Sequence, residues 1–250
     1  MARDRKAPLD DLATGERELT GESLHYLTRV LRFRSGDRFV AFDPKSGRTA
    51  DATVTEIRPG AFVVSLGPVR EAPPAREILW LHGLPKGDKA DAIVRDATEL
   101  GATTIGFVAT KHGVAKFDEA KASARRARWS KIAVEAARQS ESAMPPEILP
   151  VLSFADALAR CQAPSRSPGA SAFVLDARGG VSLGSRLREM TASSPLVFLV
   201  GPEGGLSEEE IALATDAGFV LATFGRRVLR TETVPAAVLG ALTIVGESGD

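Results

Sequence analysis

Two segments near the C-terminus contain the residue types best suited to chemistry. Residues 199–206 lead from an apolar run into a turn with three glycines, and residues 229–233 place charged and hydroxyl side chains directly before another apolar run. A glycine-rich turn at the carboxyl end of a parallel strand lets a ligand approach the backbone. The first segment therefore predicts a ligand-binding loop.

The helix expected after this turn is acidic at its start. Ser207 is a good N-cap and Glu210 completes a capping box, with Glu208 and Glu209 in the first turn. Carboxylates at a helix N-terminus offset the positive end of the helix dipole and repel phosphate. The expected ligand therefore has no phosphate groups, and a cationic ligand is compatible with the loop.

The second segment opens the last helix. Pro235 suits the first helical turn, where no N–H donor is needed, so residues 230–233 are expected at the mouth of a buried helix. A plainer alternative stays open at this point. In it, Thr233 is only a helix cap, and Arg230 and Glu232 form an ordinary ion pair.

The elements that must position these residues change in character along the chain. Before Pro73 and Pro74, which read as a linker, short strands are separated by turn residues and predict a small β domain. After the linker, strands and helices alternate, which is typical of a parallel α/β sheet with right-handed crossovers. The predicted strands are residues 38–42, 52–57, 61–66, 78–82, 104–109, 172–175, 196–200 and 219–224; the predicted helices are residues 88–100, 120–139, 208–217 and 235–245.

The strands at residues 196–200 and 219–224 each precede one of the two polar segments. We expect these strands to be neighbours in the sheet, which lets both loops converge on one ligand. Residues 164–170 combine proline, serine and glycine and are expected to form a surface loop.

Composition narrows the function classes. The 250 residues carry 32 Lys and Arg against 32 Asp and Glu, so a nucleic-acid partner would have to be held by local patches. The single cysteine, Cys161, excludes an internal disulfide, and the three histidines lack metal-ligand spacing. The apolar stretch at residues 234–245 is too short to span a bilayer, and no signal sequence is evident. These features predict a cytoplasmic protein without a metal site.

The two polar segments also carry a family resemblance. Residues 201–210 and 228–233 look like the signature segments of the bacterial 16S ribosomal RNA uridine N3-methyltransferases. Residues 25–32, 86–101 and 128–140 resemble further family motifs in the same order, so the resemblance covers nearly the whole chain.

This resemblance implies a fold, a cofactor and partners. It implies a PUA-like β-barrel RNA-binding domain at residues 1–72, and a SPOUT-type parallel-sheet domain with a C-terminal trefoil knot at residues 73–250. Family enzymes are homodimers that use S-adenosyl-L-methionine. They methylate N3 of one uridine, uridine 1498, in 16S ribosomal RNA of the small subunit.

The resemblance also implies site residues. Arg230 is expected to stabilise negative charge on the uracil or a nearby phosphate, Glu232 to position Arg230 or accept the N3 proton, and Gln139 to offer its amide to the base or cofactor. The implied cofactor-binding residues are Leu199, Gly201, Pro202, Glu203, Gly204, Gly205, Leu206, Phe224, Gly225, Val228, Leu229, Arg230, Thr231 and Thr233.

Basic residues provide the expected RNA surface. A stretch without acidic residues contains His25, Arg29, Arg32 and Arg34, and Arg3, Arg5 and Lys6 could join it. A second group, for which an ordinary solvated helix face is favoured, comprises Lys121, Arg125, Arg126, Arg128 and Lys131. The chain departs from the family by having Arg138 and Ser142 beside Gln139, and Arg138 is expected to replace a missing charge.

Three alternatives remain open. One is a SPOUT methyltransferase that acts on another RNA position. The second is a nucleotide-dependent α/β enzyme, against which the acidic helix start and the lack of a Gly-x-Gly-x-x-Gly motif argue. The third is a non-catalytic RNA-binding assembly factor that has kept the fold.

Overall fold

The computed structural model describes residues 5–43, 46–71, 76–113, 119–140, 142, 144–161, 171–191 and 193–247. The chain divides into two compact units, one formed by Met1–Pro74 with Ala137–Pro145 and the other by Ala75–Ala136 with Pro146–Asp250. The expected linker at Pro73 and Pro74 and the expected loop at residues 164–170 lie outside the described residues.

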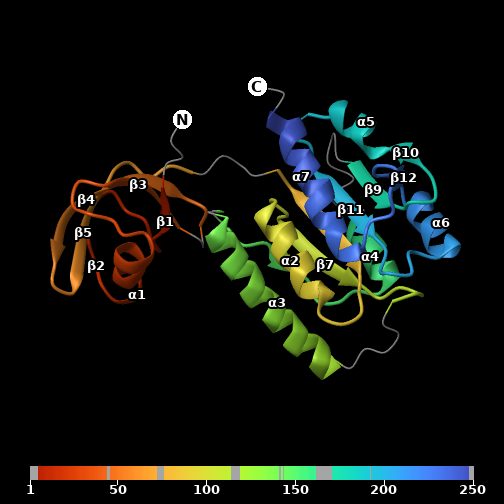
Figure 1. Ribbon diagram of the computed structural model, residues 1–250, viewed down its shortest axis with the longest axis horizontal. Coiled ribbons are helices and arrows are strands. Elements are labelled where there is room, and N and C mark those ends of the chain that lie inside the picture. The colour runs from red at the N-terminus through yellow and green to blue at the C-terminus, as the bar shows by residue number, and fades with distance from the viewer. Residues whose placement is uncertain are drawn as a thin grey trace. The chain divides into compact units, whose positions relative to one another are not determined.

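The first unit is built on a five-stranded sheet in the order β1-β3-β4-β5-β2 (Figure 1). Its strands β3 and β5 coincide with the predicted ones, whereas β1, β2 and the short helix that follows them lacked a clear periodic signal. The elements are β1 Lys6–Pro8, β2 Gly15–Leu19, α1 Gly21–His25, the π-helical turn η1 Tyr26–Val30, β3 Arg38–Phe42, β4 Thr49–Arg58 and β5 Ala61–Leu66. Alternate residues of these strands form one core around Phe62, Leu27 and Val54.

The second unit contains a seven-stranded sheet in the order β10-β12-β9-β11-β6-β7-β8, in which every pair is parallel. The predicted parallel α/β sheet is therefore confirmed. The strands are β6 Ile78–Gly83, β7 Thr104–Val108, β8 Glu147–Ile148, β9 Ser171–Leu175, β10 Val181–Ser182, β11 Leu196–Val200 and β12 Val220–Thr223. The helices are α2 Lys89–Glu99, α3 Glu119–Gln139, α4 Phe154–Cys161, α5 Leu183–Arg188, α6 Glu208–Asp216, the 3-10 turn η3 Thr231–Thr233 and α7 Val234–Glu247.

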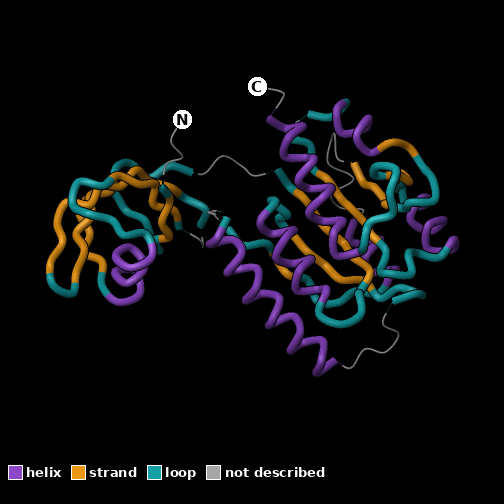
Figure 2. Tube along the Cα trace, in the orientation of Figure 1, coloured by secondary structure: helices purple, strands orange, loops and turns teal. Residues whose placement is uncertain are grey.

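Helices cover both faces of this sheet, as Figure 2 shows for the purple helices around the orange strands. Trp80 and Phe198 point to the face covered by α2, α3, α5 and α7. Leu79 and Leu199, one position along the same strands, point to the face covered by α4 and α6. Burial on both faces explains why the strands read as continuous apolar runs rather than as alternating ones.

One prediction about the sheet is wrong. β12 does not neighbour β11, because β9 lies between them: Phe198 of β11 is opposite Phe173, and Leu221 of β12 is opposite Val174. Both edges of β11 are already occupied, by β6 and β9, so β12 joins the sheet beyond β9. Chain order alone does not fix strand order in a sheet with long crossovers.

Candidate functional site

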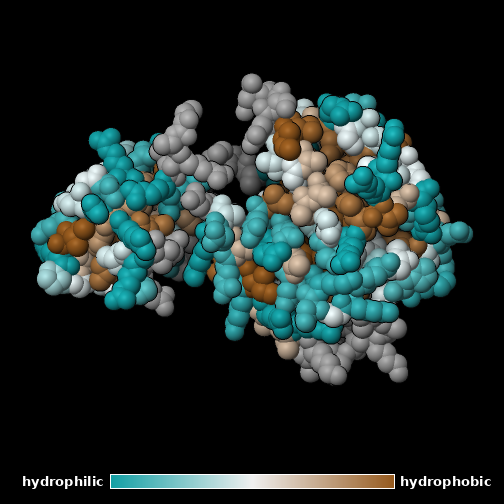
Figure 3. Space-filling model, viewed as in Figure 1, coloured by the Kyte–Doolittle hydropathy of each residue, from teal (hydrophilic) through white to brown (hydrophobic). Residues whose placement is uncertain are grey.

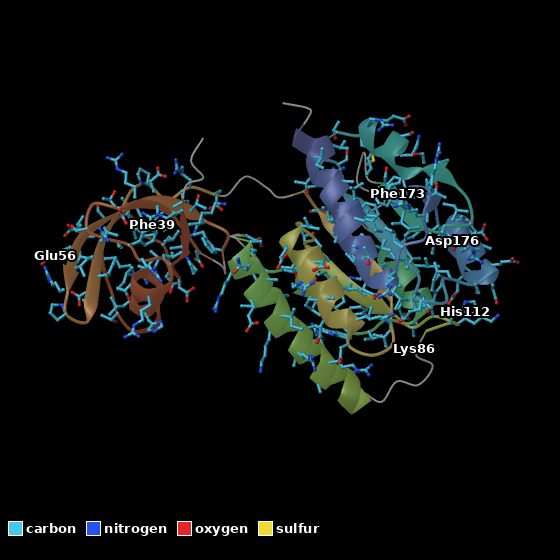
Figure 4. The ribbon with its side chains drawn as sticks, viewed as in Figure 1. Phe39, Glu56, Lys86, His112, Phe173 and Asp176 are labelled. Atoms are coloured by element: carbon cyan, nitrogen blue, oxygen red, sulfur yellow. The ribbon has the colours of Figure 1, made fainter. Side chains whose placement is uncertain are left out.

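A pocket of ≈ 580 Å³ opens at the carboxyl ends of β9, β11 and β12, in the second unit. This is the edge at which parallel α/β sheets bind ligands. Figure 4 labels Lys86, His112 and Asp176, whose side chains come from loops after β6, β7 and β9 at this same end of the sheet. The lining residues are Lys89, Leu175–Arg178, Val200–Gly205, Phe224, Arg227–Glu232 and Val234.

The glycine loop after β11, residues 201–206, forms the first wall. A side chain at Gly201 would put its Cβ 2.7 Å from the Gly205 carbonyl carbon, and one at Gly204 would put it 2.8 Å from the Cβ of His112. Gly205 has a φ of +69°, which favours glycine. The tight closure of the loop itself therefore requires these glycines.

The acidic start of α6 is confirmed. Ser207 Oγ accepts from the Glu210 N–H at 3.2 Å, and Glu210 Oε2 accepts from the Ser207 N–H at 2.8 Å, which is a full capping box. Glu210 is buried, and its other oxygen, Oε1, accepts from the Lys111 N–H at 2.8 Å. The capping box occupies two donors of this helix N-terminus and places a carboxylate there, which disfavours a phosphate.

Although their strands are not adjacent, the two loops do meet. The Thr231 hydroxyl donates to the Gly201 carbonyl at 2.9 Å, and Thr231 is buried. His82 Nε2 lies 2.6 Å from the same hydroxyl, and Trp80 Nε1 donates to His82 Nδ1 at 3.2 Å. The predicted convergence of the loops is therefore correct, and buried side chains of β6 hold it.

Two carboxylates of the pocket share one lysine. Lys89 Nζ lies 3.0 Å from Glu203 Oε1 and 3.5 Å from Glu232 Oε2. Partial burial acts to raise the pKa of Glu203, but hydrogen bonds from its own backbone and from Lys89 and the Lys86 N–H outweigh it and leave the pKa lowered. The hydrogen bond with Glu203 likewise raises the pKa of Lys89. Both charges are therefore held in place at neutral pH.

The alternative in which Arg230 and Glu232 form an ordinary ion pair does not agree with the structure. Glu232 pairs with Lys89, and no ion pair joins Glu232 to Arg230 among the described residues. Glu232 Oε2 is buried, and within the described part of the chain its contact with the Lys89 ammonium, at 3.5 Å, is too long and poorly aligned to count as a hydrogen bond. A buried carboxylate oxygen whose hydrogen-bonding capacity is only partly used is costly, and such atoms in native structures often mark functional sites.

The loop after β9, residues 176–178, forms another wall of the pocket, which was not predicted from the sequence. The Arg178 guanidinium makes two hydrogen bonds to Asp176, at 2.9 and 2.7 Å, and donates to the Leu206 carbonyl at 2.8 Å. Hydrogen bonding from Arg178 lowers the pKa of Asp176. This pair fastens the β9 loop to the glycine loop. The signal available in the sequence was an Asp directly after a buried strand at the same sheet edge.

Most of the residues named from the sequence come together here. The predicted residues that line the pocket are Gly201, Pro202, Glu203, Gly204, Gly205, Phe224, Val228, Leu229, Arg230, Thr231 and Glu232. Leu199 and Leu206 are buried in the core behind the loop. Gly225 and Thr233 are exposed beside the pocket and do not line it. Gln139 is exposed at the end of α3 and does not line it either. The unpredicted lining residues are Lys89, Leu175, Asp176, Ala177, Arg178, Val200, Arg227 and Val234.

The predicted RNA residues of the first unit are exposed on or just after α1 and η1. The side chains of His25, Arg29, Arg32 and Arg34, which we call the basic stretch, all face solvent. Asp37 sits among them, accepting from the Arg34 N–H at 2.9 Å and pairing with Arg5 at 2.9 Å, so the stretch is less purely basic than its sequence.

Several of the other basic residues serve the fold. Arg126 donates to the Ile148 carbonyl at 2.8 Å and Arg128 pairs with Asp91. These contacts within the protein favour the interpretation of the basic residues of α3 as an ordinary solvated helix face. Arg125, Lys131 and Arg138 are exposed. Arg3 and the side chain of Lys121 lie outside the described residues. Within the described ranges, no cluster of His, Cys, Asp and Glu could hold a metal ion, and no helix is long and apolar enough to cross a membrane.

Comparison with known proteins agrees with this architecture. The RNA methyltransferase domain model matches residues 72–243, and the RNA methyltransferase PUA domain model matches residues 19–66. The chain is 33% identical over 229 residues to ribosomal RNA small subunit methyltransferase E of Bacillus subtilis, covering 90% of this chain and 88% of that protein. It is 31% identical to the protein of the same name from Synechocystis, covering 92% of this chain and 73% of that protein.

Solved structures give the same result. The crystal structure of ribosomal RNA small subunit methyltransferase E from Neisseria gonorrhoeae bound to S-adenosyl methionine superposes with a TM-score of 0.73. The identity is 26%, and 97% of this chain and 98% of that chain are covered. The two-unit fold is therefore shared along its whole length.

Proposed function

Because this chain belongs to the RNA methyltransferase family, we propose that it transfers a methyl group from S-adenosylmethionine to N3 of a uridine in 16S ribosomal RNA of the small subunit. The observation that carries this proposal is the pocket in which the glycine loop and the segment at residues 227–232 meet. Full-length similarity to small subunit methyltransferases of two bacteria supports the substrate class.

The pocket suits S-adenosylmethionine by its size and its donor set. Its ≈ 580 Å³ lies within the range of small-molecule sites. Leu175, Val200 and Phe224 offer apolar surface for an adenine ring. Glu203 and Glu232 offer carboxylates to a sulfonium cation, and the helix N-terminus beside them is already capped. When bound, the cofactor supplies the electrophilic methyl group.

The residues of the chain then have to orient a uracil and manage one proton. The N3 atom is hidden in a Watson–Crick pair, so the uridine must be unpaired or flipped out. In the proposed mechanism Arg230, exposed on the pocket wall, stabilises negative charge on a uracil carbonyl or a nearby phosphate. Glu232, which lines the pocket, accepts the N3 proton on its carboxylate, and the ion pair with Lys89 holds this carboxylate in place.

Other parts of the molecule take supporting roles in the proposal. The basic stretch grips phosphates of the RNA around the target base, and Arg138 adds one charge. Gln139 is proposed to contact the base or the cofactor, which a Gln139→Ala variant with normal RNA affinity but slower methyl transfer would support. The proposed compartment is the cytoplasm, where a buried free thiol such as Cys161 stays reduced.

We also propose a homodimer and a C-terminal knot. Helix α7 is apolar almost throughout, yet Ile244 is 67% exposed. Figure 3 shows hydrophobic surface over the C-terminal part of this helix. A second copy of the chain would cover this surface. Sedimentation at several concentrations tests the dimer, and an Ile244→Lys variant that stays dimeric would place the interface elsewhere.

The decisive experiment maps methylated nucleosides in ribosomal RNA. RNA from cells lacking the protein is compared, by mass spectrometry after site-specific digestion, with RNA from the same cells expressing wild-type protein or Glu232→Gln. Loss and wild-type-dependent return of N3-methyluridine at one 16S position is expected. Return of a different methylated nucleoside would favour the alternative of another RNA position. Normal methylation in the deletion strain, together with no calorimetric binding of S-adenosylmethionine, would favour a non-catalytic assembly factor.

A further inference from the structure

A chain of buried hydrogen bonds runs from the middle of the parallel sheet to the meeting point of the two loops. Trp80 and His82 are alternate residues of β6 and have no exposed surface. The bonds run from Trp80 Nε1 to His82 Nδ1 at 3.2 Å, between His82 Nε2 and the Thr231 hydroxyl at 2.6 Å, and from that hydroxyl to the Gly201 carbonyl at 2.9 Å. Three side chains therefore connect β6 to both loops.

The chemistry of the groups permits only one direction for these bonds. The indole N–H of Trp80 can only donate, so His82 Nδ1 must accept. A neutral imidazole carries one N–H, which is then on Nε2 and donates to the Thr231 oxygen. The hydroxyl proton of Thr231 remains for the Gly201 carbonyl. In this arrangement each polar atom in the series from Trp80 to Gly201 has its hydrogen-bond partner.

Burial keeps the histidine neutral. Desolvation lowers the pKa of His82 to about 3, although the negative charge of Glu203 acts in the opposite direction. A protonated ring would also carry an N–H on Nδ1, directed against the N–H of Trp80. The tautomer is therefore fixed by its neighbours and does not change over the ordinary pH range.

These hydrogen bonds connect the two loops, which the sheet does not connect directly. Strands β11 and β12, which precede the two loops, are separated by β9 and make no ladder with each other. Gly201 opens the glycine loop, and Thr231 opens the turn before α7. Neither Trp80 nor His82 lines the pocket, so their hydrogen bonds act on it through Thr231 and Gly201.

We propose that Trp80 and His82 are positioning residues that fix the separation of the two cofactor loops by imposing one tautomer and one bond direction on the path to Gly201. The part of this proposal that concerns the cofactor rests on the proposed function. The bond direction itself does not depend on it.

Simple core filling is the competing explanation. Trp80 packs against Phe198 with ring centroids 5.5 Å apart, and His82 lies near Phe107 at 6.5 Å. If only packing mattered, the direction of the hydrogen bonds would be irrelevant, and Thr231→Val, which keeps the shape but loses the hydroxyl, would be harmless.

The first test reads the tautomer directly. Nitrogen NMR of the full-length protein labelled at histidine should show His82 as the Nε2–H tautomer, unchanged from about pH 5 to about pH 9. Trp80→Phe removes the donor to Nδ1 and should produce a mixture of tautomers. A wild-type ring that carries its proton on Nδ1, or that becomes protonated near pH 6, would overturn the proposal. This readout needs no cofactor.

The second test compares two substitutions of Thr231. Calorimetry with S-adenosylhomocysteine should show binding weakened by about tenfold or more for Thr231→Val. For Thr231→Ser, which keeps the hydroxyl, binding should weaken by no more than about threefold. Thr215→Val is the matched control, because that hydroxyl bonds only to carbonyls of its own helix. Equal binding by the Val and Ser variants would overturn the proposal. If wild type itself does not bind S-adenosylhomocysteine, the proposed function fails, and the NMR result then decides the bond direction alone.

Discussion

The basic stretch of the first unit and the pocket of the second unit hold their polar side chains in opposite ways. His25, Arg29, Arg32 and Arg34 face solvent, where salt screens charge and each contact acts nearly alone. In the pocket, buried hydrogen bonds link the loops, so one group fixes the next. We therefore expect substitutions in the basic stretch to change RNA affinity by degrees, and substitutions in the pocket to remove cofactor binding or catalysis.

The sharpest test of the pocket side of this comparison is Gly201→Ala. The added Cβ would lie 2.7 Å from Gly205 C and 2.8 Å from Leu206 N, both backbone atoms that cannot move aside cheaply. We expect a loss of stability on the order of 1–3 kcal/mol. S-adenosylhomocysteine binding should fall by about a hundredfold or more. Thermal melting and calorimetry measure the two effects.

Gly179→Ala is the matched control for this prediction. Gly179 has open space where a Cβ would stand and lies on the loop after β9 without lining the pocket. It should melt and bind the ligand like wild type. Near-normal binding by Gly201→Ala would show that the glycine loop adapts, and would remove the contrast between the two units.

The next largest effect is expected for Glu232→Gln. The amide keeps the shape of the side chain but cannot take up the N3 proton or pair with Lys89 as a charge. Single-turnover methyl transfer should slow by about 10²–10⁴-fold, whereas cofactor affinity should change by only a few-fold. Glu209→Gln, whose carboxylate is 77% exposed on α6, is the control. An unchanged rate would assign the proton to another acceptor.

Local patterns in the sequence were sufficient for one part of this architecture. The capping box of Ser207 and Glu210 spans three residues, so its pattern specifies its own geometry. The same holds for the buried strands and for α2, α6 and α7, whose bounds differ from the predicted ones by only a few residues. Shorter elements such as α4, α5 and β10 lacked enough turns or alternations to be recognised.

Contacts between distant residues could not be predicted in the same way. The place of β9 between β11 and β12 follows from which strand edges are free, and this is a property of the assembled sheet. Lys89 sits between Glu203 and Glu232 although more than a hundred residues separate it from either. Nothing in the sequence indicated that His82 contributes to the bonding of the pocket. It is buried, but its partner Thr231 is 149 residues away. The glycine and acidic motifs predicted where the pocket lies, whereas the hydrogen bonds and ion pairs within it depend on the fold.

The basic stretch should give a smaller and graded response. Arg29→Ala should weaken binding of a 16S ribosomal RNA fragment several-fold and lower the slope of log affinity against log salt by about 1, because one phosphate contact is lost. The maximal methylation rate should stay the same. Arg58→Ala, also exposed but paired with Glu56 at 2.6 Å, is the control. A lower methylation rate at saturating RNA would mean that Arg29 also affects methyl transfer, so that RNA binding and catalysis are not separated between the two units as proposed.

The smallest effect is expected from Glu203→Gln and concerns the acid side of the stability curve. The folded-state pKa of Glu203 is lowered from 4.5, so near and below this value the unfolded chain binds more protons, and stability rises with pH. The stabilisation is complete above about pH 4.5 and is lost as the pH falls through the lowered pKa. Wild type should therefore melt slightly above the variant at about pH 7, and the gap should close as the pH falls below 4.5 and through the lowered pKa. Because the side chain is 31% exposed, solvent screening keeps this gap small. A gap that widens in acid would show that the interaction of Glu203 with Lys89 does not depend on the carboxylate charge.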